Sequence, residues 1–195
     1  RVSEGVGHLG HSGHPYRGVS VLSGSDVPAS PLLGIDPGVS GAWGLLWPDG
    51  ATTAGDLPRV AGDVDAAGFA TFVRSVAPFA AVVEAVHSMP KQGVASTFRF
   101  GRAHGTVLGV LAALLVPTHL VAPVTWKRHF RLGSDKDASR GLARRLWPAC
   151  DALERKKDHG RAEALLLGRY GLERLDLDFD RHFVPETITT AGKER

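Results

Sequence analysis

The chain has 195 residues, of which 43% are hydrophobic and 22% are charged, so its composition excludes a collagen-like or wholly disordered protein. Its length suits one ordinary domain, and its longest apolar stretch, residues 107–116, is too short to cross a bilayer, so we expect no membrane association. Cys150 is the only cysteine, which excludes an intramolecular disulfide and favours a reducing compartment. Because residue 1 is Arg rather than Met, we expect a mature or shortened form that has lost a targeting segment.

Positive charge is concentrated in one third of the chain. The formal net charge is only +3, but residues 127–174 hold 13 Lys or Arg against seven Asp or Glu. The segments before and after them are slightly negative. This distribution suits a polyanionic partner such as nucleic acid, with a merely solvated basic face as the alternative.

In chain order, residues 1–30 come first and are rich in Gly, Ser and His without periodicity, which predicts a flexible arm outside the fold. Three histidines in this arm, at spacing three, would hold a metal only on a helix, and the glycines between them disfavour one. The patterns that follow predict strands over 31–36, 41–47, 51–54 and 80–84, a helix around 69–76, a helix over 94–115, a strand over 118–124, a helical turn over 124–130, and two helices capped by Ser134 and Asp158.

This order of elements predicts an α/β fold with a mixed sheet that opens with an antiparallel meander. We expect one folded domain over residues 31–173 and a tail over residues 174–195. In the helix after Ser134, one side should carry the apolar residues Ala138, Leu142 and Leu146.

Carboxylates end two of the predicted strands, at Asp36 and Glu84. Burying a charge is costly unless something pairs with it, and neighbouring strands would bring these two carboxylates to the same sheet edge, where they could share Mg²⁺. Asp158 and Glu163 could join them, although five residues on a helix separate side chains by about 140°. Each of the four also has an ordinary interpretation, as a turn residue, an ion-pair partner, a helix cap or a surface group.

Three segments then show a resemblance to a known family. Residues 34–38, 82–84 and 156–166 together resemble the RuvC-type Holliday junction resolvases of the RNase H-like superfamily, and the last run most resembles the chloroplast resolvase of plants and algae. Residues 123–127 and 135–140 resemble basic segments of that family. The resemblance covers about residues 32–172.

The resemblance implies an RNase H-like mixed five-stranded sheet flanked by helices, a homodimer, and a structure-specific endonuclease that resolves Holliday junctions by paired symmetric hydrolysis. It also implies a site that holds two Mg²⁺ ions, with Mn²⁺ as a substitute, on four carboxylates: Asp36, Glu84, Asp158 and Glu163. We expect Asp36 to bridge both ions, Glu84 and Glu163 to hold one each, and Asp158 to complete the shell or orient the water. Bacterial members have the last two acids three residues apart rather than five, which leaves the inner ligand open and favours the organellar branch.

Several basic or polar residues are candidate DNA contacts. Lys127 and Lys136 could reach the scissile phosphate, with general backbone attraction as the alternative. The loop over 87–93 is expected to enter the junction. The remaining candidates are Lys91 and Gln92 in that loop and Arg140, Lys156 and Lys157 in the basic third. Phe98 and Phe100, just after the loop, are expected in the core.

The helix over 94–115 carries a row of small residues at Gly101, Gly105 and Gly109. These would let a partner helix approach closely in a homodimer, with packing on the sheet as the alternative.

Two other classes of protein share some of these features. A sugar kinase or actin-like protein shares the motif around Asp36 but needs two such domains and a longer chain. A non-catalytic architectural protein that binds four-way junctions would keep the basic stretch without needing all four carboxylates. For localisation we expect the chloroplast, with a bacterial or phage-infected cytoplasm as the alternative.

Overall fold

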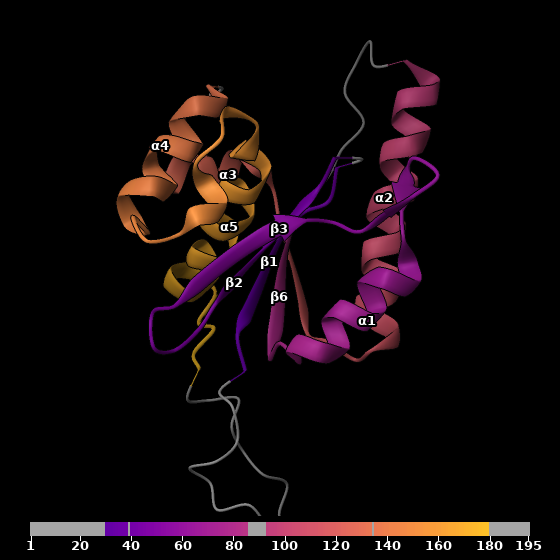
Figure 1. Cartoon of the computed structure of the whole chain (residues 1–195), viewed down its shortest axis with the longest axis horizontal. Helices are drawn as coiled ribbons and strands as arrows, with labels where there is room; N and C mark the ends of the chain where they lie inside the picture. Colours follow the sequence, from indigo (N-terminus) through magenta and orange to yellow (C-terminus); the bar gives the residue numbers. More distant parts are fainter. Residues whose placement is uncertain (1–29, 39, 86–92, 134, 180–195) are drawn as a thin grey trace, which may run out of the picture.

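The computed structural model describes residues 30–38, 40–85, 93–133 and 135–179, with Lys136 described by its backbone only. A five-stranded sheet in the order β3-β2-β1-β6-β7 forms its centre (Figure 1). The strands are β1 (Leu32–Asp36), β2 (Ala42–Leu46), β3 (Thr52–Asp56), β6 (Ala80–Glu84) and β7 (Thr118–Val121). Strands β1, β2 and β3 are antiparallel neighbours, whereas β6 and β7 run parallel to β1. The sheet is therefore mixed and opens with the predicted meander.

Helices cover both faces of the sheet (Figure 1). Helices α1 (Ala66–Val76) and α2 (Val94–Ala113) lie on one face, and α3 (Pro123–His129), α4 (Lys136–Leu146) and α5 (His159–Arg174) lie on the other. Two short 3₁₀ turns, η1 (Asp151–Leu153) and η2 (Lys156–Asp158), lead into α5. A small hairpin of β4 (Arg59–Val60) and β5 (Asp63–Val64), which the sequence patterns did not predict, follows β3.

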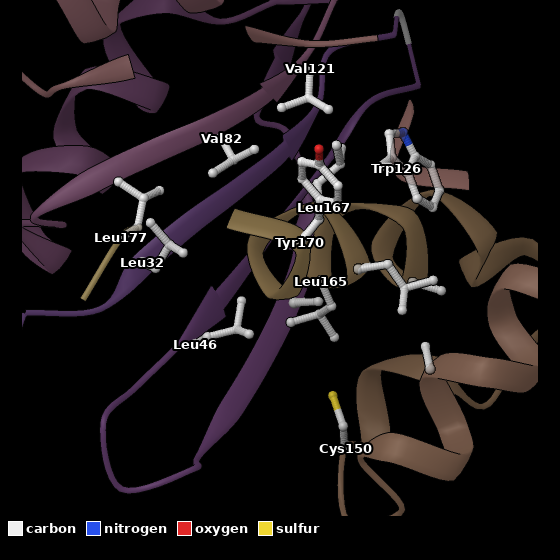
Figure 2. Close-up of a cluster of buried hydrophobic side chains, with 14 of the residues drawn as sticks. Leu32, Leu46, Val82, Val121, Trp126, Cys150, Leu165, Leu167, Tyr170 and Leu177 are labelled. Atoms are coloured by element: carbon white, nitrogen blue, oxygen red, sulfur yellow. The ribbon is translucent and has the colours of Figure 1, made fainter. Parts of the chain in front are cut away.

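The alternation of side chains along each strand divides the core in two. Leu33 and Ile35 of β1 pack among residues of α1 and α2, whereas Leu32 packs with residues of α5. The second cluster surrounds α5, with Leu165, Leu167 and Tyr170 gathered against the strands (Figure 2). Even-numbered residues of β1 and β6 face α5. Asp36 and Glu84, at the ends of these strands, therefore lie on the side of the sheet that α5 covers.

Helix α5 lies very close to β1 and β2 because small residues face it. A Cβ atom on Gly34 would stand 1.9 Å from the carbonyl oxygen of Ala164, and one on Gly44 would stand 2.8 Å from the backbone nitrogen of Leu165. Only glycine permits such an approach. The close contact brings the first turns of α5 to the carboxyl edge of the sheet.

Several local expectations were wrong. Asp135, not Ser134, caps α4, and its side chain accepts from the backbone N–H of Asp137 at 2.9 Å. Among the described side chains of α4, Ser139 and Ala143 are buried, the expected Leu142 is partly buried against the core, and the expected Leu146 is exposed. Ser139 is buried because its hydroxyl has a partner on α5, a signal that apolar periodicity does not carry.

Helix α2 also differs from the expectation. Phe98 is 66% exposed rather than in the core, and Cβ atoms on Gly101, Gly105 and Gly109 would meet no atom of the described residues within 4 Å. The buried face of α2 is made of Ala103, Val107 and Leu111. Packing of the glycines on the sheet is therefore excluded. No helix in the described ranges is long and apolar enough to span a membrane.

Candidate functional site

Two carboxylates meet at one edge of the sheet because β1 and β6 are parallel neighbours in register. Ile35 pairs with Val83, so the next residues along the two strands are Asp36 and Glu84. Both strands end there, at their carboxyl ends. Both side chains lie on the α5 side, as the alternation requires.

Glu163 of α5 supplies a third carboxylate. It is 9% exposed, and its Oε1 accepts a hydrogen bond from the Ser139 hydroxyl at 3.1 Å and lies 3.0 Å from Lys127 Nζ. Lys127 also lies over the Trp126 ring, 5.1 Å from its centroid. Helices α3, α4 and α5 thus converge on this one side chain.

The three carboxylates lie close enough for the charge of one to affect the pKa of another. Burial, together with the negative charges of Glu84 and Glu163, raises the pKa of Asp36 to about 7, although a hydrogen bond from the Gly38 N–H and the charge of Lys127 act in the opposite direction. Burial and the charge of Glu163 also raise the pKa of Glu84. The site therefore holds more negative charge than its neighbours neutralise.

Trp126 holds Glu84 in place. The Trp126 side chain is fully buried, and its indole Nε1 donates to Glu84 Oε1 at 3.0 Å. This hydrogen bond lowers the pKa of Glu84 against the larger effect of burial. No local sequence pattern marks Trp126 or Ser139 as site residues, because their partners lie far away in the chain.

Asp158 does not join the three carboxylates. Its side chain is 2% exposed and accepts hydrogen bonds from Arg155 at 2.7 to 3.3 Å, and Arg161 Nη1 lies 3.6 Å from its Oδ1. Burial opposes its ionisation, but the Arg155 hydrogen bonds and the charges of both arginines outweigh this, so the pKa of Asp158 is lowered. The side chain makes no capping hydrogen bond to α5, which Asp158 immediately precedes, but it accepts a hydrogen bond from the backbone N–H of Arg155 at the start of η2. The structure therefore brings Asp36, Glu84 and Glu163 together and pairs Asp158 with the two arginines, whereas metal binding by these acids stays a prediction.

The residue three positions before Glu163 is Gly160. A Cβ atom there would stand 3.3 Å from Asp36 Oδ2. Position 160 therefore faces the carboxylate site, whereas Asp158, two residues earlier, turns toward the arginines.

Asp36, Glu84 and Glu163 offer the oxygen ligands that Mg²⁺ prefers, and the charges of Glu84 and Glu163, after burial, contribute to the raised pKa of Asp36. In the described residues, however, no group of three or more His, Cys, Asp or Glu has the spacing of a formed metal site. The donor chemistry fits a hard cation, and the side chains would need to draw together around it.

The candidate DNA contacts are distributed unevenly. Lys127 lies at the carboxylates, whereas Lys156 and Lys157 are exposed on η2. Arg140 is largely engaged within the protein, by the Glu154 carbonyl at 3.3 Å and by Asp137 at 3.6 Å. Lys91, Gln92 and the Lys136 side chain lie outside the described residues.

The fold of this chain is similar to that of solved RuvC structures. RuvC of Thermus thermophilus in complex with a Holliday junction substrate matches with a TM-score of 0.55 and 20% identity, over 74% of this chain and 96% of that chain. A second structure of Thermus thermophilus RuvC matches with a TM-score of 0.51 and 18% identity, over 73% and 95% of the two chains. The yeast mitochondrial Holliday junction resolvase gives a TM-score of 0.45 and 15% identity, over 72% and 77%. No family model and no curated protein matches the sequence. The chain has the RNase H-like fold of RuvC, as predicted.

Proposed function

We propose that this chain is a metal-dependent endodeoxyribonuclease that resolves four-way DNA junctions by paired, symmetric phosphodiester hydrolysis. The observation that carries the proposal is the meeting of Asp36, Glu84 and Glu163 at one edge of a RuvC-like sheet. The RuvC structure that matches this chain contains a Holliday junction substrate, which supports junction DNA as the substrate here.

Mg²⁺, with Mn²⁺ as a substitute, would be held by Asp36, Glu84 and Glu163. Two such ions, when bound, supply an activated water and stabilise the leaving 3′ oxygen. Trp126 and Ser139 orient the Glu84 and Glu163 carboxylates through hydrogen bonds. Lys127 contacts Glu163 at the site. As a mobile point charge, it could exchange this partner for a phosphate oxygen of the substrate.

A basic groove beside the carboxylates supports a nucleic-acid substrate. It has a volume of about 720 Å³ and is lined by six residues of α3 and the segment after it, namely Val124, Lys127, Arg128, Arg131, Leu132 and Gly133. Because Lys127 belongs both to this groove and to the carboxylate site, a DNA backbone bound in the groove would pass the site. Backbone phosphates are the groups that such cations recognise.

A homodimer would supply the second active site that symmetric cleavage of a two-fold junction requires. The outward side of α2 is the surface we assign to it, because Phe98 is exposed there and Gly101, Gly105 and Gly109 leave room for a close helix. Function in the chloroplast is part of the proposal and depends only on the resemblance of residues 156–166 to the organellar branch.

The competing function is that of a junction-binding architectural protein without cleavage. It is favoured by the engagement of Asp158 with Arg155 and Arg161, which removes one of the four expected carboxylates from the site. Such a protein would use the basic groove and bind the junction without cutting it.

A cleavage assay separates these functions. A labelled four-way junction and a linear duplex are incubated with the wild-type chain, Asp36→Asn and the exposed control Asp49→Asn, each with Mg²⁺, Mn²⁺ or EDTA. We expect paired symmetric nicks in the junction alone, which require a divalent metal and are lost only in Asp36→Asn. Binding of the junction without cleavage under every condition would establish the architectural function instead.

A further inference from the structure

A cavity of about 310 Å³ lies at the start of α5, on the side of the carboxylate site nearer to β3 and β4. Its volume is at the lower end of the range for small-ligand sites. Ionised side chains make up much of its lining: Arg59, Arg155, Lys157, Arg161, Asp56 and Asp158. We call it the Arg59–Lys157 pocket.

The two carboxylates of this pocket are already matched by two of its arginines. Arg161 holds Asp56 with two parallel hydrogen bonds, Nε to Oδ1 at 2.8 Å and Nη2 to Oδ2 at 2.9 Å. Arg155 Nη2 donates to Asp158 Oδ1 at 2.7 Å. These pairs fix both guanidinium groups in the wall of the pocket.

Arg59 and Lys157 remain without a carboxylate partner among the described residues. Both are exposed, and neither forms an ion pair in the described part of the chain. The lining therefore carries two positive charges in excess, which favours an anion and disfavours a metal cation. A guanidinium and an ammonium group facing one cavity are typical partners of phosphate oxygens.

The pocket borders the carboxylate site through Gly160. This residue lines the pocket, and a Cβ atom on it would stand 3.3 Å from Asp36 Oδ2 and 3.9 Å from the Ser40 carbonyl oxygen. Without a side chain at position 160, little separates the two compartments. A nucleic-acid strand with one phosphate at the carboxylates would therefore bring a neighbouring phosphate to the pocket.

We infer that the Arg59–Lys157 pocket binds a backbone phosphate of the nucleic acid, next to the phosphate at the carboxylate site. The identity of the strand as junction DNA rests on the proposed function, whereas phosphate binding by the pocket does not. Asp56 and Asp158 hold Arg161 and Arg155 in place, while Arg59 and Lys157 provide the excess charge.

The first test measures DNA binding by the full chain in EDTA, so that no cleavage occurs. The double variant Arg59→Ala/Lys157→Ala is compared with Arg74→Ala/Arg174→Ala, which removes the same charge from exposed helix ends away from the pocket. Fluorescence anisotropy with a labelled four-way junction and a linear duplex is recorded over a range of NaCl concentrations. We expect about a 10-fold loss of affinity near 0.1 M NaCl and a salt slope shallower by about 1 to 2, with a smaller change in the control.

The second test uses inorganic phosphate without DNA. The side-chain Nε–H resonance of Arg155 is followed by NMR as phosphate is added, with NaCl at matched ionic strength as the reference. We expect a saturable shift at millimolar phosphate that is lost in Arg59→Ala/Lys157→Ala and kept in the control pair.

The outcomes separate this inference from the proposed function. The wild-type chain could bind junction and duplex equally well while the pocket variant loses affinity and salt slope. That result would refute the resolvase function and support phosphate binding by the pocket. If the wild-type chain prefers the junction but the pocket variant behaves like the control, the inference about the pocket is overturned and the proposed function is not. If the wild-type chain binds no DNA, the phosphate titration decides, and an Arg155 resonance that does not respond overturns the inference.

Discussion

Trp126 donates its indole N–H to Glu84 across 3.0 Å, although the two residues lie 42 positions apart in the chain. The next residue, Lys127, lies 3.0 Å from Glu163. Two consecutive residues of the short helix α3 therefore contact two of the three carboxylates, one from β6 and one from α5. The position of α3 decides where both acidic side chains point.

Replacement of Trp126 by Phe tests this arrangement. The ring is kept but the donor is lost, so Glu84 loses the one hydrogen bond that lowers its pKa. We expect junction cleavage to fall about 10- to 100-fold, equivalent to about 1–3 kcal/mol, with junction binding retained. The matched control is Trp43→Phe, which removes an indole hydrogen bond to the Asp56 carbonyl at 3.1 Å. Equal cleavage by the two variants would contradict a positioning role for Trp126.

Asp36 predicts a pH dependence of stability in the absence of divalent metal. Its pKa is about 7 in the folded chain against 3.8 for the ordinary group, so between these values the folded state binds more protons than the unfolded state. The free energy of unfolding should therefore fall as pH rises from about 4 to 7, and Asp36→Asn should remove that decline. At pH 8 we expect the variant to be more stable by about 1–3 kcal/mol in urea denaturation.

The same measurement with added Mg²⁺ tests metal binding without reference to activity. The metal should raise the midpoint of wild-type unfolding and leave Asp36→Asn nearly unchanged, since only the wild-type site attracts the cation strongly. The control Asp49→Asn should follow the wild type. A wild-type midpoint that does not respond to Mg²⁺ would refute this site.

Asp158 is expected to stabilise the fold rather than to bind metal. Its lowered pKa means that its stabilising contribution is present above about pH 4 and is lost as pH falls through the folded pKa. Asp158→Asn should lower the free energy of unfolding at pH 7 by about 1–3 kcal/mol, because Arg155 loses its charged partner. The exposed Asp151→Asn is the control. If Asp158→Asn keeps metal-dependent cleavage, the site needs only three carboxylates. If a folded Asp158→Asn variant loses cleavage completely, Asp158 is a fourth carboxylate of the site.

The approach of α5 to the sheet depends on Gly34. In Gly34→Ala the new Cβ would collide with backbone atoms of α5, so we expect a loss of at least about 3 kcal/mol or failure to fold. Gly141→Ala on α4 is the contrasting change, since its Cβ would have ordinary space 3.8 Å from the Arg145 side chain. It should stabilise the chain by about 0.5–1 kcal/mol. Thermal unfolding of both variants checks the pair, and similar midpoints would show that α5 can shift freely.

The proposed dimer surface on α2 is tested with Gly105→Glu. A Cβ at this position meets no atom within 4 Å in the part of the chain that the structure describes, so the monomer should fold normally, while a buried charge should prevent close association of two helices. The control is Ala67→Glu at an exposed position in the first turn of α1. Sedimentation velocity should show a dimer for the wild type and the control and a monomer for Gly105→Glu. A monomeric wild type would remove the dimer from the proposal.

Much of the fold follows from patterns that are local in the chain. The short apolar strands, the turn after Asp36 and the apolar spacing around Phe69 depend on neighbouring residues, so the order of strands and helices could be predicted. Asp36 and Glu84 could be paired in advance for the same reason, since each ends a buried strand. The β4–β5 hairpin was missed because two-residue strands leave no periodicity.

The partners of the acidic residues could only come from the tertiary structure. The family resemblance, rather than the spacing, placed Asp158 in one site with Glu163, but the direction of each side chain depends on which neighbours α5 meets when it packs on the glycines of β1 and β2. Asp158 meets two guanidinium groups, whereas Glu163 meets Ser139 and Lys127. The sequence by itself determined the fold class and the candidate acids, because these depend on local patterns. The tertiary structure alone decided that Glu163, and not Asp158, lies with Asp36 and Glu84, because that depends on contacts between distant segments.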